Sequence, residues 1–480
     1  MRERGVLRLR LSSPVHGLER RRLGAVEVFA QSVSGAAPSA AMAATPVIVA
    51  ASAGASTIWS FVVATALALL IAGCIGRFTC RMAAPGGLYS LTAKGLGPGA
   101  AFACGVASVV GYGLLAAGAL AGAAGYLEEL VIRSGGSGGP VLTIPAALLI
   151  GCVVGAFALR GVRLSARVVL LIESVAITLM VVVFALLLVS GAAVGSPGPD
   201  TDGPGLVGVA AGVLPALAAF IGFEVATALG AEARHPFRSV PRAVTATAAT
   251  AGVLYLFAAQ TQIVGFATTP GGLAAQPEPV LTLAAAQGWW FIPALLDLGL
   301  IMSFFACALA TMTALVRVLF SLARDGVAAE ALGRAHTRFR TPHAALAVAL
   351  PVVVVALIGP LAIGVPIGVT LVALLTLATC GFLVAYLLVC LAAPVFLHRI
   401  GELTWPAVAA TALIVPVLLV VLVAFVAGSP LSALPLAGLV GLGGGWYLWL
   451  RAHRAAQLRG IGVYDETLAT DVLTRPGQVA

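Results

Sequence analysis

The chain has 480 residues, of which 60% are hydrophobic and only 9% are charged, and its formal net charge is +9. Soluble domains have about a quarter of their residues charged, so the composition excludes the soluble globular class. The mean hydropathy of +1.08 indicates instead a polytopic membrane protein that folds as one unit.

Apolar stretches long enough to cross a bilayer recur along the whole chain. A helix needs about 20 apolar residues to cross the hydrocarbon core. On this criterion we predict an all-α membrane protein with about twelve transmembrane helices. In chain order the predicted spans cover residues 25–51, 55–76, 97–127, 141–159, 164–192, 205–230, 243–267, 288–322, 344–364, 366–397, 405–427 and 431–450.

Positive charge is distributed unevenly among the loops that join these spans. If the N-terminus lies in the cytoplasm, 26 of the 27 Lys and Arg residues fall on the cytoplasmic side, and only Arg133 falls outside. Cytoplasmic loops of membrane proteins carry such an excess. The sequence therefore predicts a cell-membrane protein with cytoplasmic tails at 1–23 and 452–480, without a secretory signal peptide and without a nucleic-acid partner.

Two of the predicted spans are interrupted by residues that weaken helices. The first contains QSVSGAAPSA at 31–40, and the sixth contains AAFIGFE at 218–224, where Gly222 stands near Glu224. Gly35 and Gly222 are 187 residues apart, and the second break comes five spans after the first, as in an inverted repeat. A pair of glycine kinks that serve only helix packing is the alternative.

The transmembrane domain is predicted to cover residues 24–451, and the spacing of the breaks predicts how it divides into repeats. We expect a first repeat of five helices over about 24–192, a second over about 205–397, and two extra helices over about 405–450. The loops between them are too short to fold as separate domains.

A helix broken inside the membrane exposes backbone groups that bind charged solutes. One half-helix ends in free C=O groups, which attract an ammonium group or a cation, and the other begins with free N–H groups, which attract a carboxylate. Such backbone survives only where protein or a water-filled cavity covers it. The arrangement suits an amino-acid zwitterion, and it also suits other small polar solutes.

Three motifs in chain order resemble the amino acid–polyamine–organocation (APC) superfamily of permeases. They are APGGLYSLTAKGLGPGAAF at 84–102, GFEVATALGAEARHPFRSVPRAV at 222–244 and TALVRVLFSLARDGVAAEALGRAHTRFRTPHAA at 313–345. They are similar to the family's loop after span 2, its span 6 with the following loop, and its exit from span 8. The resemblance implies a leucine-transporter-type fold of ten core helices plus two. It also implies a secondary active transporter of amino acids or related amines that works by alternating access.

The same resemblance assigns roles to the residues of the two breaks. Glu224 would belong to the gating or proton-coupling network, and a carboxylate at this depth is a functional residue by default. The fifth span lacks the lysine that some proton-coupled relatives have, and Thr311 and Thr313 in span 8 do not establish a sodium site. The residues implied to bind or cover the substrate are Ser34, Gly35, Ala36 and Ala37, which would meet its carboxylate, and Phe220, Gly222 and Phe223.

Other polar residues have simpler interpretations. Glu173 in span 5 is either a proton relay or the partner of basic residues at 160–167, and Asp297 is expected to be hydrated. Glu232 is expected to pair with Arg234 at the inner surface, and Tyr386 to pack within span 10. The seven cysteines are expected to be buried apolar residues, not a disulfide or metal framework.

Rival function classes find little support in the sequence. An embedded enzyme is not expected, because the HExxH motif is missing and all six histidines lie outside the predicted spans. The acidic-basic loop motif of facilitators with two six-helix halves is missing after span 2. Two alternatives stay open: a transporter-like sensor without turnover, and a polyamine or organic-cation exchanger. We expect a small-molecule substrate, surrounding lipid, protons as the candidate coupling ion, and no cofactor or metal.

Overall fold

The computed structural model describes residues 17–189, 205–276, 278–428 and 430–462. Residues 1–16 and 463–480, which form most of the two predicted tails, lie outside these described ranges. The described residues form helices and turns and contain no β-strand; their one extended contact is an isolated bridge between Leu23 and Ala233. The prediction of an all-α protein is confirmed for this part of the chain.

Helices lie at each of the predicted spans. The first half contains α1 (Ala25–Gly35), α2 (Pro38–Ala53), α3 (Thr57–Thr79), α5 (Pro98–Arg133), α6 (Pro140–Leu159) and α7 (Val162–Val189). The second half contains α8 (Leu206–Ala218), α9 (Pro236–Gly265), α11 (Ile292–Arg324), α12 (His343–Ala362), α13 (Ile367–Arg399), α14 (Trp405–Gly428) and α15 (Pro430–His453).

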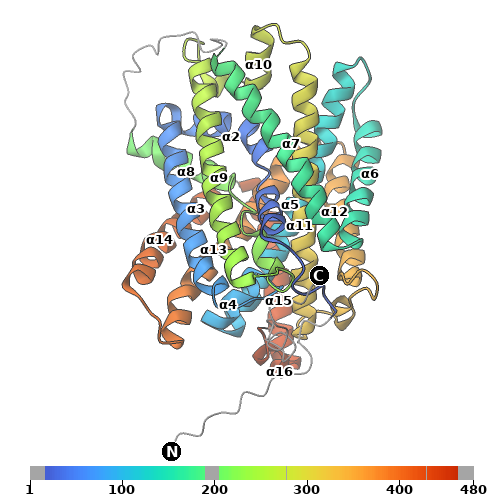
Figure 1. Ribbon diagram of the computed structural model, residues 1–480, viewed down its shortest axis with the longest axis vertical. Coiled ribbons are helices and arrows are strands. Elements are labelled where there is room, and N and C mark those ends of the chain that lie inside the picture. The colour runs from blue at the N-terminus through green and yellow to red at the C-terminus, as the bar shows by residue number, and fades with distance from the viewer. Residues whose placement is uncertain (1–16, 190–204, 277, 429, 463–480) are drawn as a thin grey trace, which may run out of the picture.

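Shorter elements join these helices. They are the helices α4 (Leu88–Leu96), α10 (Pro279–Ala286) and α16 (Ala455–Arg459), and the 3-10 helices η1 (Gly54–Ser56), η2 (Val225–Leu229), η3 (Leu273–Ala275) and η4 (Glu330–Gly333). Figure 1 shows the long helices gathered into one bundle, with α10 at one end and α4 and α16 at the other.

Length and apolar composition decide which helices are able to cross a membrane. Nine helical stretches of the described chain meet this requirement, one of them being 25–79, which holds two predicted spans. The apolar helix α8 is shorter, because its span is broken. The count of twelve crossings stays a prediction.

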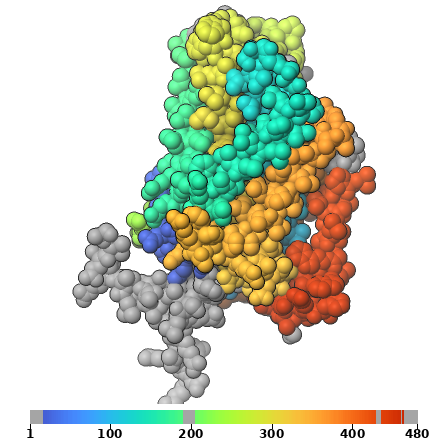
Figure 2. All heavy atoms as spheres, turned by 90° about the vertical axis from the view of Figure 1, so that its right-hand side faces the viewer, coloured from blue at the N-terminus to red at the C-terminus, as the bar shows by residue number. Residues whose placement is uncertain are grey.

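The most buried spans are α5, α11 and α13, and α14 is the least buried. Small residues let the central helices approach one another. A Cβ atom on Gly122 of α5 would lie 2.7 Å from the ring of Phe304 on α11, and one on Gly111 would lie 3.0 Å from the ring of Phe382 on α13. Figure 2 shows α6 and α12 crossing one face of the bundle, with the C-terminal helices at its edge.

The outer surface of these helices is apolar. Leu149 on α6, Val253 on α9 and Val352 on α12 are all exposed. Soluble proteins rarely expose extensive apolar surface, whereas a bilayer is a natural solvent for it.

One helix begins earlier than its apolar pattern predicts. The predicted span starts at residue 243, but α9 begins at Pro236, seven residues before it. Proline is favoured in the first turn of a helix, where its missing N–H has no intrahelical acceptor. Charged residues at 238 and 242 hide this start from a search for apolar residues alone.

Candidate functional site

The breaks in the first and sixth predicted spans occur where the sequence places them. α1 ends at Gly35, the backbone of Ala37 is left-handed with φ 44°, and α2 begins at Pro38. α8 ends at Ala218, and the chain continues through turns into η2, with Gly222 at φ 96°. Positive φ is accessible to glycine at little cost, so Gly222 suits this turn.

The two breaks meet at Gly35 and Gly222. A Cβ atom on Gly222 would lie 2.6 Å from the carbonyl carbon of Gly35, and a Cβ atom on Gly35 would lie 2.7 Å from Cγ2 of Val225. Ser32 connects the same segments, because its hydroxyl donates a hydrogen bond to the carbonyl of Phe223. The unwound backbones are therefore in direct contact, which only residues without a side chain permit.

Side chains of neighbouring helices hold the broken backbone. The hydroxyl of Tyr255 on α9 donates to the carbonyl of Ala219 at 2.8 Å, and the thiol of Cys307 on α11 lies 3.4 Å from the carbonyl oxygen of Gly35. The ring of Phe220 contacts that of Tyr255, with centroids 5.0 Å apart. Helices α9 and α11 thus satisfy carbonyl groups that the breaks release.

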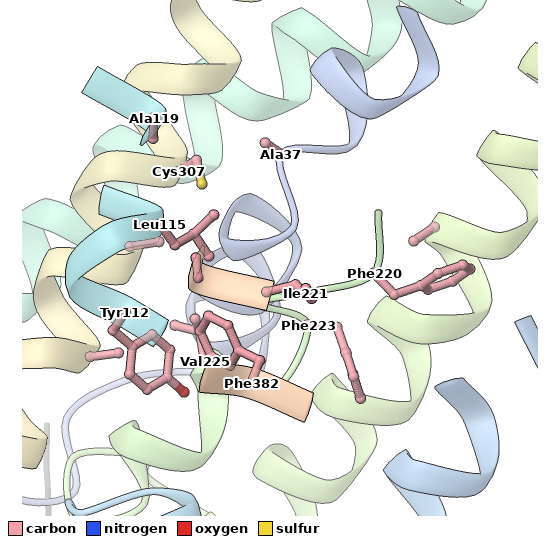
Figure 3. Packing of buried hydrophobic residues seen from close by; sticks show 14 of the residues in the cluster. Ala37, Tyr112, Leu115, Ala119, Phe220, Ile221, Phe223, Val225, Cys307 and Phe382 are labelled. Atoms are coloured by element: carbon pink, nitrogen blue, oxygen red, sulfur yellow. The ribbon is translucent and has the colours of Figure 1, made fainter. Parts of the chain in front are cut away.

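The residues predicted to bind or cover the substrate lie together at this junction. Figure 3 shows Ala37 on the connection between α1 and α2, with Phe220 and Phe223 on the chain that follows α8. The rings of Phe223 and Tyr386 lie 5.6 Å apart, so Phe223 also contacts α13. All of the set are buried: Ser34, Gly35, Ala36, Ala37, Phe220, Gly222 and Phe223.

Glu224 is fully buried at the end of the second break. The hydroxyl of Tyr112 on α5 donates to its Oε1 at 2.9 Å, and the hydroxyl of Tyr386 on α13 donates to its Oε2. Among the residues that the structure describes, no basic side chain forms an ion pair with this carboxyl group. Both tyrosines are more than 100 positions away in sequence, so no local pattern identified them as its partners.

Glu173 on α7 forms a second buried carboxyl group near the breaks. The hydroxyl of Ser303 on α11 donates to its Oε1 at 3.1 Å. The basic residues at 160–167, which were the alternative partners of Glu173, form no ion pair with it within the described part of the chain. Arg167 instead pairs with Glu27 at 3.2 Å. The interpretation of Glu173 as part of an ion pair with that group is therefore wrong.

The connection between η2 and α9 is tied to α11 by a buried ion pair. Nη2 and Nε of Arg317 each lie 2.6 Å from an oxygen of Glu232, and Arg317 also donates to the carbonyl of Thr313 at 2.7 Å. The prediction that Glu232 pairs with Arg234 is wrong. Instead, the backbone N–H of Arg234 donates to the carbonyl of Leu23 at 2.8 Å, joining the segment before α1 to this connection.

The opposite end of the bundle holds another ion pair. Nε of Arg133, at the end of α5, lies 2.9 Å from Oδ2 of Asp297 on α11, and Nη2 lies 3.5 Å from Glu278. The side chain of Asp297 is fully buried. The expectation that Asp297 is hydrated is therefore wrong, and the single basic residue expected on that side is its partner.

Comparison with known proteins gives a family match over most of the chain. The model of the amino acid permease family matches residues 23–450. A methylthioribose transporter from Bacillus subtilis is 24% identical over 62% of this chain, a branched-chain amino acid permease from the same organism is 24% identical over 60%, and human cationic amino acid transporter 4 is 28% identical over 61%. The matches span 66%, 63% and 48% of these relatives' own lengths, less than two thirds of each.

A solved structure shares the arrangement of helices. The chain is similar to the crystal structure of a manganese transporter from Eremococcus coleocola, with a TM-score of 0.52 and 13% sequence identity, over 90% of this chain and 95% of that one. At this identity the similarity shows the fold alone. It confirms the predicted membrane fold of the leucine-transporter type, whereas the boundaries of the two repeats stay a prediction.

Proposed function

Because the chain belongs to the amino acid permease family, we propose that it is a secondary active transporter of amino acids or related amines in the cell membrane. The observation that carries this proposal is the contact between two broken helices at Gly35 and Gly222. Broken helices that meet at membrane depth present both N–H and C=O groups to a small charged solute. The names of similar proteins, which include branched-chain and cationic amino acid carriers, support the same substrate class.

The substrate site that we propose is the junction of the two breaks. Residues 34–37 provide backbone groups and the Ser34 hydroxyl, while Phe220 and Phe223 cover the site from the second break. The side chain of Ser34 is buried and makes no hydrogen bond with any residue of the described chain, so it has free capacity for a ligand. Movement of one predicted repeat (24–192) against the other (205–397) would expose this site to each side of the membrane in turn.

Glu224 is the residue that we assign to gating or proton coupling. It follows the second break directly, and its two oxygens receive hydrogen bonds from α5 and α13. A change in the angle of η2 during transport would break one or both of these bonds. The carboxyl group would then be more stable in a different protonation state, which would couple proton occupancy to the conformational change.

The proposed orientation places both termini in the cytoplasm. Labelling of single cysteines in a cysteine-free background tests it, with Ala455→Cys for the predicted inside and Ser134→Cys, near Arg133, for the predicted outside; both positions are exposed. An impermeant thiol reagent applied to intact cells should label only Ser134→Cys. Labelling of Ala455→Cys alone would show that the orientation is the reverse of the proposed one.

Counterflow in proteoliposomes tests transport and separates it from the sensor alternative. Vesicles that contain the purified full chain are loaded with unlabelled leucine, lysine or putrescine, and entry of the same compound in radiolabelled form is followed. A transporter accumulates label by exchange, whereas a sensor without turnover binds ligand and accumulates none. If neither leucine, lysine nor putrescine enters loaded vesicles, although one of them raises the melting temperature of the protein, the transport function is wrong and the sensor is supported.

No cofactor takes part in this proposal. Among residues 17–189, 205–276, 278–428 and 430–462, no group of three or more His, Cys, Asp or Glu side chains is placed to hold a metal ion. The proposed chemistry needs only backbone groups, hydroxyls and carboxyl groups of the chain itself.

A further inference from the structure

Glu173 is a buried carboxyl group with one oxygen, Oε2, that makes no hydrogen bond within the described part of the chain. Its side chain is 3% exposed, and Oε1 accepts one hydrogen bond from Ser303. Oε2 has no hydrogen-bond partner in the described part of the chain, and the same holds for the buried hydroxyls of Ser34 and Ser39. Buried polar atoms are almost always paired, so unpaired atoms gathered beside a helix break indicate a place for a ligand.

The carboxyl group of Glu173 lies at the start of α2. Ser39, the second residue of that helix, lies next to it, but the Ser39 hydroxyl and Glu173 Oε2 form no hydrogen bond with each other. The first N–H groups of a helix have no acceptor within the helix and attract anions. Glu173 therefore lies at a helix N-terminus that attracts anions, directly after residues 34–37, which the resemblance to the APC superfamily assigns to the carboxylate of the substrate.

The helix that carries Glu173 packs beside both breaks. Helix α7 contacts α1 and α2 directly, and it also contacts α9 and α11, which carry Tyr255 and Cys307. Tyr255 in turn contacts the carbonyl of Ala219 in the second break, and Cys307 contacts that of Gly35 in the first. The end of α1 presents carbonyl groups, which favour positive charge. The region where α7 meets the breaks thus contains a carboxyl group, hydroxyls and carbonyls, which are all acceptors for an N–H donor.

Glu224, the other buried carboxyl group near the breaks, is already held by side chains of the protein. Both oxygens of Glu224 already accept hydrogen bonds from tyrosines. Within the described ranges, no arginine, lysine or histidine forms an ion pair with Glu173. A buried carboxylate without a cation is costly, and a cationic ligand that pairs with it removes that cost.

We propose that Glu173 binds the ammonium group of the transported solute, and that the ammonium group, not the carboxylate, is the group that this protein requires in its substrates. The inference rests on the proposed function. A primary ammonium has three N–H donors. Glu173 Oε2, a hydroxyl of Ser34 or Ser39, and the carbonyl of Gly35 provide three acceptors around the junction.

Ligands that differ by one charged group test this directly. The probes are leucine, 3-methylbutylamine, which lacks the carboxylate, and 4-methylpentanoate, which lacks the ammonium, together with lysine and cadaverine. Binding to the purified full chain is measured by isothermal titration calorimetry, and folding by size-exclusion chromatography. The variants are Glu173→Gln, which keeps the size and an acceptor for Ser303, and Glu278→Gln, a matched control that removes an exposed carboxylate elsewhere.

We expect 3-methylbutylamine to bind wild-type protein within about tenfold of leucine, and 4-methylpentanoate to bind at least about 30-fold more weakly. Glu173→Gln should weaken every ammonium-containing ligand that binds by about 30-fold or more, and Glu278→Gln should leave affinities unchanged. Equal binding of leucine and 4-methylpentanoate would overturn the inference. Full affinity of Glu173→Gln for the ammonium-containing ligands would also overturn it, because that result is expected if Glu173 only carries protons. If the variant does not fold, the wild-type comparison still decides whether the ammonium group is required. Failure of wild-type protein to bind any of the five probes would contradict the proposed function and this inference together.

Discussion

Replacing Gly222 by alanine should destabilise the protein more than replacing Gly35, because two penalties act at Gly222 and one at Gly35. At Gly222 the backbone has φ 96°, and left-handed backbone costs an L-residue about 1–2 kcal/mol. In addition, the new Cβ atom would lie 2.6 Å from the carbonyl carbon of Gly35, and overpacking of this kind costs about 1–3 kcal/mol. The sum is about 2–5 kcal/mol for Gly222→Ala against about 1–3 kcal/mol for Gly35→Ala.

A matched control separates this contact from a general effect of alanine. Gly359 lies on the exposed face of α12, and a Cβ atom there meets nothing within 4 Å. Because glycine is unfavourable inside a helix, Gly359→Ala should be neutral or stabilise the protein by about 0.5–1 kcal/mol.

The assay is thermal unfolding of purified protein, followed by tryptophan fluorescence at one scan rate. We expect melting temperatures to fall in the order Gly359→Ala, wild type, Gly35→Ala, Gly222→Ala. The double variant at Gly35 and Gly222 should lose less than the sum of the single losses, because the first Cβ atom already separates the two backbones. A melting temperature of Gly222→Ala equal to that of Gly359→Ala would refute the close contact of the breaks.

Four further variants test charged groups of the bundle. Arg317→Gln leaves the buried Glu232 without its partner and should destabilise the protein by about 3–5 kcal/mol. Arg81→Gln, which removes one member of an exposed pair, should cost only about 0–1 kcal/mol. Equal melting temperatures of the two variants would contradict this difference. Arg133→Gln should lower the melting temperature well below that of wild type, because it leaves Asp297 buried and unpaired; an unchanged value would mean that the pair contributes no stability. Glu224→Gln should fold and bind substrate, but its uptake into proteoliposomes should no longer depend on pH; a wild-type pH profile would make the carboxyl group structural.

Local patterns in the sequence predict the helices and the position of both breaks. Apolar runs of sufficient length identify the spans, and Gly35, Pro38 and Gly222 mark the interruptions that the structure contains at the ends of α1 and α8. Short helices such as α4 and α10 are not predicted from apolar runs, because nine or eight residues do not give a transmembrane signal. The predicted family and fold class are confirmed, whereas the roles of the site residues stay predictions.

The partners of the buried charged groups could not be predicted in this way. Tyr386 lies 162 positions from Glu224, and Arg317 lies 85 positions from Glu232. Such pairs depend on how α11 and α13 pack beside the breaks, and packing between distant helices leaves no periodic pattern in either segment. The near neighbours that sequence reasoning favoured, such as Arg234 for Glu232, are accordingly wrong.

Electron cryomicroscopy of the full chain in lipid nanodiscs, with bound leucine or 3-methylbutylamine, would locate the ligand. We expect ligand density at the junction of the two breaks, within hydrogen-bonding distance of residues 34–39 and 219–224, with the nitrogen of the ligand beside Glu173. Ligand density elsewhere, for example in the apolar groove of about 480 Å³ that Phe102 on α5, Cys380 on α13 and Tyr447 on α15 help to line, together with an empty junction, would contradict it.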